Sequence, residues 1–218
     1  MRPAAFFDMD RTLLRIHTAP LHARFMVSEG FSRKRDLALP GFRIALFGAG
    51  ILDDPQPAML RVARLCAGLD ASRVKERART WVSSELATYA RPAALRHLEG
   101  HRKAGDLLVL LTSSLSFPAE QIAEQFGIPH VLSNILEIGR DGRYTGNLHE
   151  PLCFGEGKAQ RVLSFADEQE IDLAASTFYT DQHHDLPALL AVGKPRPVNP
   201  DRTLKRQARS RGWPVLYW

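Results

Sequence analysis

The amino-acid sequence predicts an α/β protein with a parallel sheet, an inserted helical cap and a small β-hairpin. Three observations lead to this fold class. Apolar runs too short for helices recur along the chain, helical patterns lie between several of them, and about 95 residues separate the first two runs. Strands that alternate with helices are typical of a parallel sheet.

Five segments are predicted to be strands. The first is residues 4–9, AAFFDM, which ends in carboxylates, and the second is residues 107–111, LLVLL, which is followed directly by hydroxyl side chains. Residues 178–180 precede an aspartate in the same way, and residues 128–132 and 195–198 complete the set. Apolar runs of this length favour buried strands over helices.

Helices are predicted between these strands. Residues 118–126 begin with proline and are followed by glycine, the residues favoured in the first turn and just past the end of a helix. Residues 157–169 and 201–211 also have helical periodicity, and the second of these is basic. Residues 137–149 break the alternation, because Asp141-Gly142 between two short alternating runs predicts a hairpin.

The interval between the first two strands is much longer than the dozen or so residues that a crossover needs. It shows helical spacing and is interrupted at Pro40-Gly41 and at residues 53–57. We therefore predict a helical cap insertion at residues 15–92 and a catalytic α/β core formed by residues 1–14 and 93–218. Residues 47–53 contain Gly-Ala-Gly but no third glycine, so we expect a helix–helix loop there rather than a dinucleotide site.

The composition of the 218-residue chain excludes several classes of protein. Hydrophobic residues make up 44% and charged residues 24%, as in ordinary globular proteins. No apolar run approaches the roughly 20 residues of a membrane span, and the N-terminus lacks the apolar region of a signal peptide. Cys66 and Cys153 lie far apart, which favours neither a disulfide framework nor a zinc site. We therefore expect a cytoplasmic protein that does not bind a membrane.

The charge is unevenly distributed along the chain. The net charge is +5, with an excess of +6 in residues 15–91, +6 in residues 192–218 and −7 in residues 92–191. Such a basic balance permits nucleic-acid binding. The sequence has no zinc finger, no RNA-recognition signature and no basic run interleaved with aromatic residues, so we expect solvated helix faces instead.

Polar side chains follow three of the predicted strands at the point where each strand ends. Asp8 and Asp10 end the first strand, residues 112–114 follow the second, and Asp181 and Asp185 follow a later one. Ligands bind beyond the carboxyl ends of parallel strands. Neighbouring carboxylates repel one another, a divalent cation relieves that repulsion, and two oxygens four residues apart suit magnesium.

Taken alone, each feature has a simpler interpretation. The two aspartates after the first strand can be a capped strand end, and Thr112 can be an ordinary helix cap. Lys158, in the segment GEGK, can be an exposed lysine, because the other residues of a phosphate-binding loop are missing. His183 and His184 are interpreted as solvent-facing loop residues rather than zinc ligands, because adjacent histidines point in different directions.

In combination and in this order, the motifs resemble the haloacid dehalogenase-like hydrolase superfamily. FFDMDRTL matches its first motif, LLVLLTSS its second, GEGK its third and YTDQHHDLPAL its fourth. The large insertion after the first motif is similar to the subfamily that includes phosphoserine phosphatase, subfamily IB. The C-terminal PVNPDRTLKRQARSRGWPVL looks like the end of uncharacterised bacterial hydrolases of that subfamily. The resemblance implies a Rossmann-like three-layer core with a parallel sheet.

The resemblance also implies a magnesium-dependent phosphomonoester hydrolase that acts on a small phosphorylated metabolite through an aspartyl-phosphate. It assigns Asp8 as the nucleophile and Asp10 as the general acid and base. Lys158 would balance negative charge. Mg²⁺ would be held by Asp8, the main-chain carbonyl of Asp10 and Asp181, with Asp185 supporting the site.

Substrate binding is implied for three further residues. The Thr112 hydroxyl and the Ser113 amide would hold a phosphoryl oxygen. Arg11 stands where the subfamily commonly has a small or polar residue, and it is a candidate for contact with the substrate. Phosphoserine phosphatases carry a glutamate for the substrate amine where this chain has His17, so we expect a substrate other than phosphoserine.

Two alternatives stay open at this point. One is a phosphotransferase on the same scaffold, and the other is a non-catalytic, basic nucleic-acid-binding protein. The sequence makes no prediction of the oligomeric state.

Overall fold

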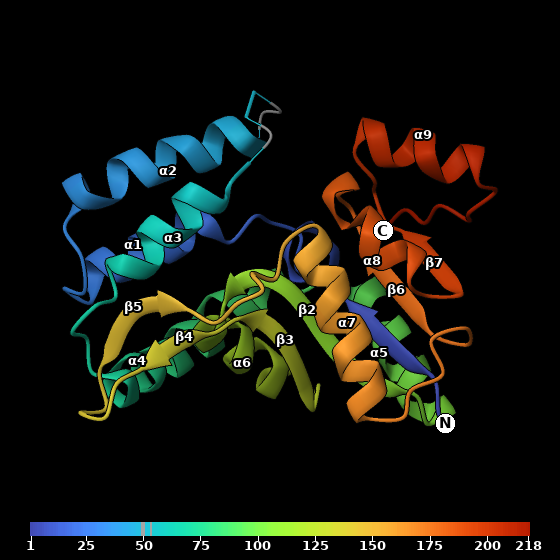
Figure 1. Cartoon of the computed structure of the whole chain (residues 1–218), viewed down its shortest axis with the longest axis horizontal. Coiled ribbons are helices and arrows are strands. Elements are labelled where there is room, and N and C mark those ends of the chain that lie inside the picture. The colour runs from blue at the N-terminus through green and yellow to red at the C-terminus, as the bar shows by residue number, and fades with distance from the viewer. Residues whose placement is uncertain (49–50, 53) are drawn as a thin grey trace.

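A five-stranded parallel sheet forms the centre of the protein (Figure 1). The computed structural model describes residues 1–48, 51–52 and 54–218, so three residues of the predicted loop at 47–53 lie outside the described residues. The strands follow the order β3-β2-β1-β6-β7. Their bounds are β1 Ala4–Phe7, β2 Leu107–Leu115, β3 His130–Asn134, β6 Thr177–Thr180 and β7 Lys194–Pro197.

Helices cover both faces of this sheet and give three layers. Side chains alternate along β1, so that Ala5 and Phe7 face one apolar cluster while Ala4 and Phe6 face another. The first cluster includes α5 (Pro92–Ala104) and α6 (Ser116–Gln125). The second includes α7 (Glu156–Glu168), α8 (Leu186–Leu190) and α9 (Arg202–Ser210). The predicted α/β fold with a Rossmann-like parallel sheet is confirmed.

The predicted hairpin is also confirmed. Strands β4 (Leu136–Ile138) and β5 (Tyr144–Leu148) pair antiparallel. Gly142 occupies the turn with a φ of 77°, a conformation that glycine adopts without strain, and its amide donates to the carbonyl of Gly139 at 3.0 Å.

Between β1 and α5, the chain forms a helical segment, by which we mean residues 15–92. Its helices are α1 (Ala19–Ser28), α2 (Lys34–Gly48), α3 (Gln56–Arg64), α4 (Ala71–Ser84) and the 3₁₀ turn Leu86–Tyr89. Figure 1 shows α1, α2 and α3 together at the end of the molecule opposite β7 and α9. The break predicted at Pro40-Gly41 is wrong, because both residues lie inside α2. Pro40 is buried there, so packing outweighs the main-chain hydrogen bond that proline cannot make.

The two connections between the helical segment and the sheet run side by side. Leu14 and Ala90 form an antiparallel bridge. The amide of Arg15 donates to the carbonyl of Tyr89, and the amide of Arg91 donates to the carbonyl of Leu13, each at 2.9 Å. These bonds join the two connections into one short ribbon.

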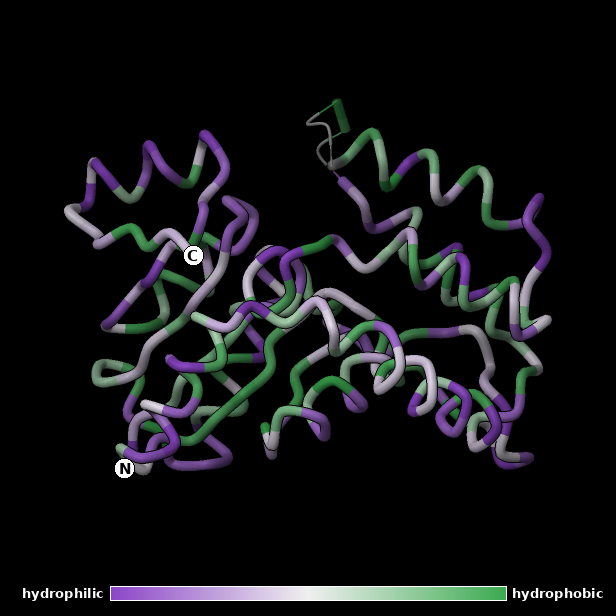
Figure 2. The backbone as a smooth tube through the Cα atoms, turned by 180° about the vertical axis from the view of Figure 1, so that it is seen from behind, coloured by the Kyte–Doolittle hydropathy of each residue, from purple (hydrophilic) through white to green (hydrophobic). Residues whose placement is uncertain are grey.

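Hydropathy differs among the outer helices. Figure 2 shows that α9 is hydrophilic along most of its length, whereas α2 carries many hydrophobic residues. Among the described residues, no helix is long and apolar enough to cross a membrane.

Candidate active site

The candidate site lies at the carboxyl end of β1, the central strand. Its neighbours β2 and β6 both run parallel to it, and the chain reaches them on opposite sides of β1. Ligands bind at such a switch point in open α/β sheets. Asp8 directly follows β1, and its amide donates to the carbonyl of Tyr179 at 2.9 Å, which holds the ends of β1 and β6 together.

A wide turn at Met9–Leu13 carries Asp10 and Arg11 over the end of the sheet. The amide of Leu13 donates to the carbonyl of Asp8 at 3.1 Å. Arg11 has a φ of 58°, which is strained for a residue other than glycine. Its side chain turns toward the acidic cluster, by which we mean Asp8, Asp10, Asp181 and Asp185. The Nε atom of Arg11 lies 3.2 Å from Oδ2 of Asp181.

Asp10 is held from the start of the helical segment. Its Oδ2 accepts a hydrogen bond from the amide of Thr18 at 3.2 Å and lies 3.3 Å from Nδ1 of His17. His17, which stands where phosphoserine phosphatases carry a glutamate, therefore lies next to Asp10, the predicted general acid.

Lys158 connects two of the predicted site aspartates. Only 1% of its side chain is exposed, and its Nζ donates to Oδ1 of Asp8 at 2.8 Å and to Oδ2 of Asp185 at 2.7 Å. The interpretation of Lys158 as an exposed lysine is thus excluded. Gly157 permits this approach, because a Cβ at that position would lie 2.1 Å from the carbonyl oxygen of Leu152.

Asp185 lies at the start of α8, as predicted, but its side chain does not cap that helix. Its Oδ2 accepts a second hydrogen bond from Oγ1 of Thr180 at 2.5 Å. Sequence reasoning missed Thr180, although its place directly before Asp181 at the end of a buried strand was a signal for it.

Burial dominates the electrostatics of the cluster. It raises the pKa of Asp8 to about 7, and the charges of Asp185 and Asp10 add to this effect while Lys158 opposes it. Burial also raises the pKa of Asp181 to about 8, with Asp8 and Asp185 adding and Arg11 opposing. For Lys158, burial alone would lower the pKa, but the carboxylates of Asp185 and Asp8 raise it, so the ammonium stays charged.

Several carboxylate oxygens of the cluster lack hydrogen-bond partners. Both side-chain oxygens of Asp181 and Oδ1 of Asp10 are buried and accept no hydrogen bond, even though Arg11 lies close to Asp181. Buried acceptors of this kind are the oxygen ligands that a magnesium ion takes, so the residues fit such an ion. Within the described part of the chain, no three side chains of His, Cys, Asp or Glu are arranged to hold a metal ion. The predicted magnesium ligands do not form such a group of three side chains. They are the carboxylates of Asp8 and Asp181 and the main-chain oxygen of Asp10.

The second motif lies inside a strand rather than after one. We expected a strand that ends at Leu111, but β2 continues to Leu115, with a register shift against β3 between these two residues. Thr112 is buried, and its Oγ1 accepts from the amide of Ser114 at 3.1 Å. The Ser113 hydroxyl donates to the carbonyl of Cys153 at 2.7 Å.

The two histidines of the fourth motif differ in their surroundings. The His183 side chain is 40% exposed, and its Nδ1 lies 2.9 Å from Oδ2 of Asp201. His184 is partly exposed like His183, and both lie in a 3₁₀ turn at His183–Asp185 rather than in an open loop. The His184 ring packs against Phe47 of α2 at 4.8 Å and Phe154 at 5.2 Å between centroids, contacts that bring distant parts of the chain together.

The parallel sheet and the lysine-bridged carboxylates at the end of its central strand define an α/β enzyme. The profile of the family described as haloacid dehalogenase-like hydrolase matches residues 5–190. The chain belongs to this family, and it is an enzyme of the phosphatase type.

Several relatives match nearly the whole chain, among them a Streptomyces protein and a Neisseria phosphatase. The inhibition of morphological differentiation protein of Streptomyces azureus is 31% identical over 99% of this chain and 78% of its own length. A histidinol-phosphatase of Neisseria meningitidis is 28% identical over 99% of both chains.

Solved structures share the fold of this chain. A protein of unknown function from Bordetella pertussis has a TM-score of 0.87 and 30% identity, and the match covers 99% of this chain and 98% of that one. A substrate-bound phosphoserine phosphatase shares the fold, with a TM-score of 0.68 at 18% identity over 95% of this chain and 90% of that one. The predicted resemblance to phosphoserine phosphatase-like members of the family is confirmed.

Proposed function

We propose that this protein is a Mg²⁺-dependent phosphomonoester hydrolase that acts on a small phosphorylated metabolite through an aspartyl-phosphate. The observation that carries the proposal is the position of Lys158, whose buried ammonium contacts both Asp8 and Asp185. A buried cation beside a carboxylate nucleophile stabilises the charge that develops when that carboxylate meets an anionic phosphate.

In the first step, the Asp8 carboxylate attacks phosphorus as the bond from phosphorus to the leaving oxygen breaks. Asp10 donates a proton to that oxygen, and the alcohol departs. In the second step, Asp10 accepts a proton from water, the water oxygen bonds to phosphorus, and the acyl phosphate breaks to release inorganic phosphate and free Asp8. The Thr18 amide and His17 hold Asp10 in place for both transfers.

Asp8, the carbonyl of Asp10 and Asp181 would hold Mg²⁺, with Asp185 supporting the site through its bond to Lys158. When bound, the ion neutralises the charges of the nucleophile and the phosphate. Thr112, the Ser113 amide and Arg11 are proposed to bind the phosphoryl group. The two buried, unpartnered side-chain oxygens of Asp181 support its assignment as a magnesium ligand.

We propose that phosphoserine is a poor substrate. Residues 11–17 contain no acid for a substrate ammonium, and Glu29, the next acid along the chain, is paired with Arg77 at 2.5 Å. Asp36 lies 3.7 Å from Arg35, and Asp54 accepts from the amide of Gln56 at 2.9 Å. Asp53, a further acid of the helical segment, lies outside the described residues.

Histidinol phosphate is a second candidate substrate, because the match to the Neisseria histidinol-phosphatase spans 99% of both chains. This substrate also carries an amine. Turnover of histidinol phosphate, phosphoserine and an amine-free phosphate ester should therefore be compared. Preference for histidinol phosphate would favour that substrate, and preference for the amine-free ester would favour a substrate without an amine.

The helical segment, residues 15–92, is proposed to act as a cap over a catalytic core of residues 1–14 and 93–218. The paired connections at Leu14 and Ala90 and the contact of Phe47 with His184 support this division. A cytoplasmic location is proposed from the two free, buried cysteines.

The test is hydrolysis of a generic aryl phosphate with and without Mg²⁺. We expect activity that EDTA abolishes, and no turnover in Asp8→Asn, whose amide has a similar shape but cannot act as the nucleophile. Asp167→Asn, an exposed aspartate of α7, is the matched control and should keep full activity. Turnover by pure Asp8→Asn would refute the assignment. Transfer to added alcohols in preference to water would favour the phosphotransferase, and salt-sensitive DNA binding without hydrolysis would favour the nucleic-acid binder.

A further inference from the structure

Asp181 is paired with a cation that is separate from the Lys158 bridge. The Asp181 side chain is fully buried directly after β6, and Nε of Arg11 lies 3.2 Å from its Oδ2. The ammonium of Lys158 contacts Asp8 and Asp185 instead. Among the described residues, Arg11 is therefore the cation in an ion pair with Asp181, the carboxylate assigned above to Mg²⁺.

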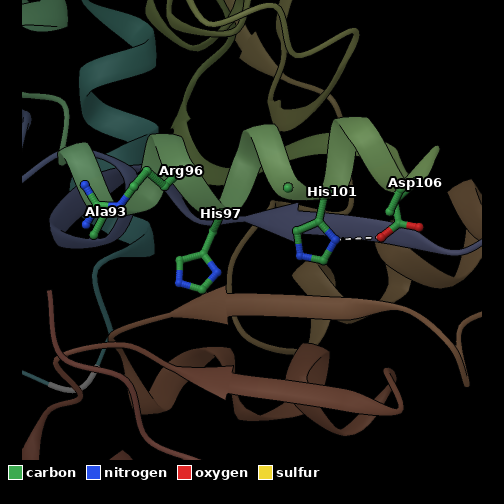
Figure 3. A pocket seen from close by; sticks show the side chains of 7 residues that line it. Ala93, Arg96, His97, His101 and Asp106 are labelled. Carbon is green, nitrogen blue, oxygen red and sulfur yellow. Dashed lines mark hydrogen bonds and ion pairs between the residues drawn. The ribbon is translucent and has the colours of Figure 1, made fainter.

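This ion pair leaves the oxygens of Asp181 without hydrogen bonds. Both side-chain oxygens are buried and accept none. Figure 3 shows how another carboxylate of the protein is satisfied, since Oδ2 of Asp106 lies 2.6 Å from Nδ1 of His101. The other ring nitrogen of His101 lies 2.9 Å from the Tyr179 hydroxyl, which completes that network. Arg11 thus offsets the charge of Asp181 but leaves its oxygens free to accept from or bind another group.

The two members of the pair differ in their freedom to move. Asp181 is fixed, because its side chain is fully buried and its carbonyl accepts from the amide of Asp201 at 2.8 Å. The main chain of Arg11 is also fixed, since its amide donates to the carbonyl of Ile16 at 2.9 Å. The Arg11 side chain, however, is 48% exposed. Its guanidinium can therefore leave Asp181 by rotation about side-chain bonds alone.

Electrostatics set Arg11 against a second cation on Asp181. Burial raises the pKa of Asp181 to about 8, and the other carboxylates of the acidic cluster add to this effect while Arg11 opposes it. The guanidinium thus offsets part of the negative charge that attracts a divalent ion. Two cations in contact with one carboxylate also repel each other. Arg11 and a metal ion are for these reasons alternative partners of the same oxygens.

We propose that Arg11 competes with Mg²⁺ for Asp181, and that its guanidinium becomes available to the substrate only when Asp181 binds the ion. This inference rests on the magnesium site proposed above. It gives the binding events an order. Asp181 first exchanges Arg11 for the ion, and the half-exposed guanidinium then meets the anionic phosphate ester.

Isothermal titration of EDTA-treated protein with MgCl₂, without substrate and at constant ionic strength, tests the competition without measuring turnover. Arg11→Gln removes the charge and keeps a polar side chain. Arg15→Gln is the matched control: Arg15 is also exposed and lies in residues 11–17, but its guanidinium lies over the ring of Tyr89 at 5.1 Å.

We expect the dissociation constant for Mg²⁺ to fall at least about fivefold in Arg11→Gln, as for coupled binding events, and less than about twofold in Arg15→Gln, whose charge is screened. Far-UV circular dichroism checks that both variants are folded. A crystal structure of the wild type grown with Mg²⁺ needs no variant. It should show the ion on Asp181 and the Arg11 guanidinium beyond about 4 Å from that carboxylate, the limit of an ion pair.

Mg²⁺ affinity in Arg11→Gln that is equal to or weaker than that of the wild type would overturn the proposal. So would an equal gain in Arg15→Gln, or an ion on Asp181 with Arg11 still in contact. These results leave the magnesium site itself intact. If neither the wild type nor Arg11→Gln binds Mg²⁺, or if the ion binds away from Asp181, the proposed magnesium site is wrong and the competition fails with it.

Discussion

The carboxyl groups of Asp8 and Asp181 make the stability of the metal-free protein depend on pH. Burial raises the pKa of Asp181 from 3.8 to about 8 and that of Asp8 to about 7. The folded state therefore keeps protons that the unfolded chain releases above about pH 4. The stability they contribute is fully present below that pH and is lost as the pH rises through 7 and 8.

We therefore expect the melting temperature of EDTA-treated protein to fall as the pH is raised from 4 to 8. Mg²⁺ should restore more of it at pH 8 than at pH 5, because at pH 5 the ion must displace protons. Differential scanning fluorimetry with and without Mg²⁺ measures both effects. In Asp181→Asn the pH dependence should flatten and the gain from Mg²⁺ should shrink. A variant that responds to Mg²⁺ like the wild type would remove Asp181 from the ligand set.

Among the elements, the turn at residues 11–17 has the clearest consequence for specificity. It places Arg11 and His17 beside the site aspartates and contains no acid, while Arg15 lies over the ring of Tyr89. A substrate ammonium would meet like charges there, whereas an anionic or neutral polar group would not. We expect kcat/KM for phosphoserine to be no higher than for phosphoglycolate, which lacks the amine. A tenfold preference for phosphoserine, about 1.4 kcal/mol in transition-state binding, would mean that another acid meets the amine.

The start of α9 is a second element whose stability rests on one residue. Asp201 accepts from the amide of Leu204 at 2.8 Å as an N-cap and from the amide and ring of His183 at 2.8 and 2.9 Å. Asp201→Ala should lower the free energy of unfolding by about 0.5–2 kcal/mol, the usual cost of a lost cap. Urea denaturation measures this change. Asp172→Ala, which caps no helix, tests by comparison whether the loss of the cap explains the effect.

Local sequence patterns predicted most of the helices and strands, but they missed features that depend on contacts between distant parts of the chain. The hairpin at Asp141-Gly142 follows from its own turn chemistry and was found. The extension of β2 to Leu115 depends on pairing with β3, and the helical path through Pro40 depends on burial, so neither is visible in a local window. The contact between Arg11 and Asp181 joins residues 170 positions apart, and no spacing rule anticipates it.

For the whole molecule, the apolar core predicts that the helical segment and the sheet unfold together. Phe25 and Trp81 of the helical segment stack at 4.5 Å between centroids, and Phe25 also meets Phe117 of α6 at 6.3 Å. All three belong to one buried cluster that extends to β1. A shared apolar interface of this kind couples the unfolding of the helical segment and the sheet, because unfolding of either part exposes the apolar surface of the other to water.

The double variant Trp213→Phe, Trp218→Phe leaves Trp81 as the sole tryptophan, so its fluorescence reports on the helical segment. We expect its thermal transition to coincide with that of far-UV circular dichroism. Two separate midpoints would show that the helical segment melts independently.

The central position of β1 has a consequence for how the protein is made on the ribosome. β1 is synthesised before the other strands of its sheet, yet it pairs with β6, and the amide of Ala4 bonds to Ser176, 172 residues later. At about 5–20 residues per second, that partner emerges roughly ten to thirty seconds after β1. During this time β1, which Asp8 directly follows, has at least one unpaired edge, and Asp181 has not yet been synthesised. The proposed catalytic site is therefore complete only once β6 and the residues that follow it have been synthesised, and the growing polypeptide must protect an apolar edge until then.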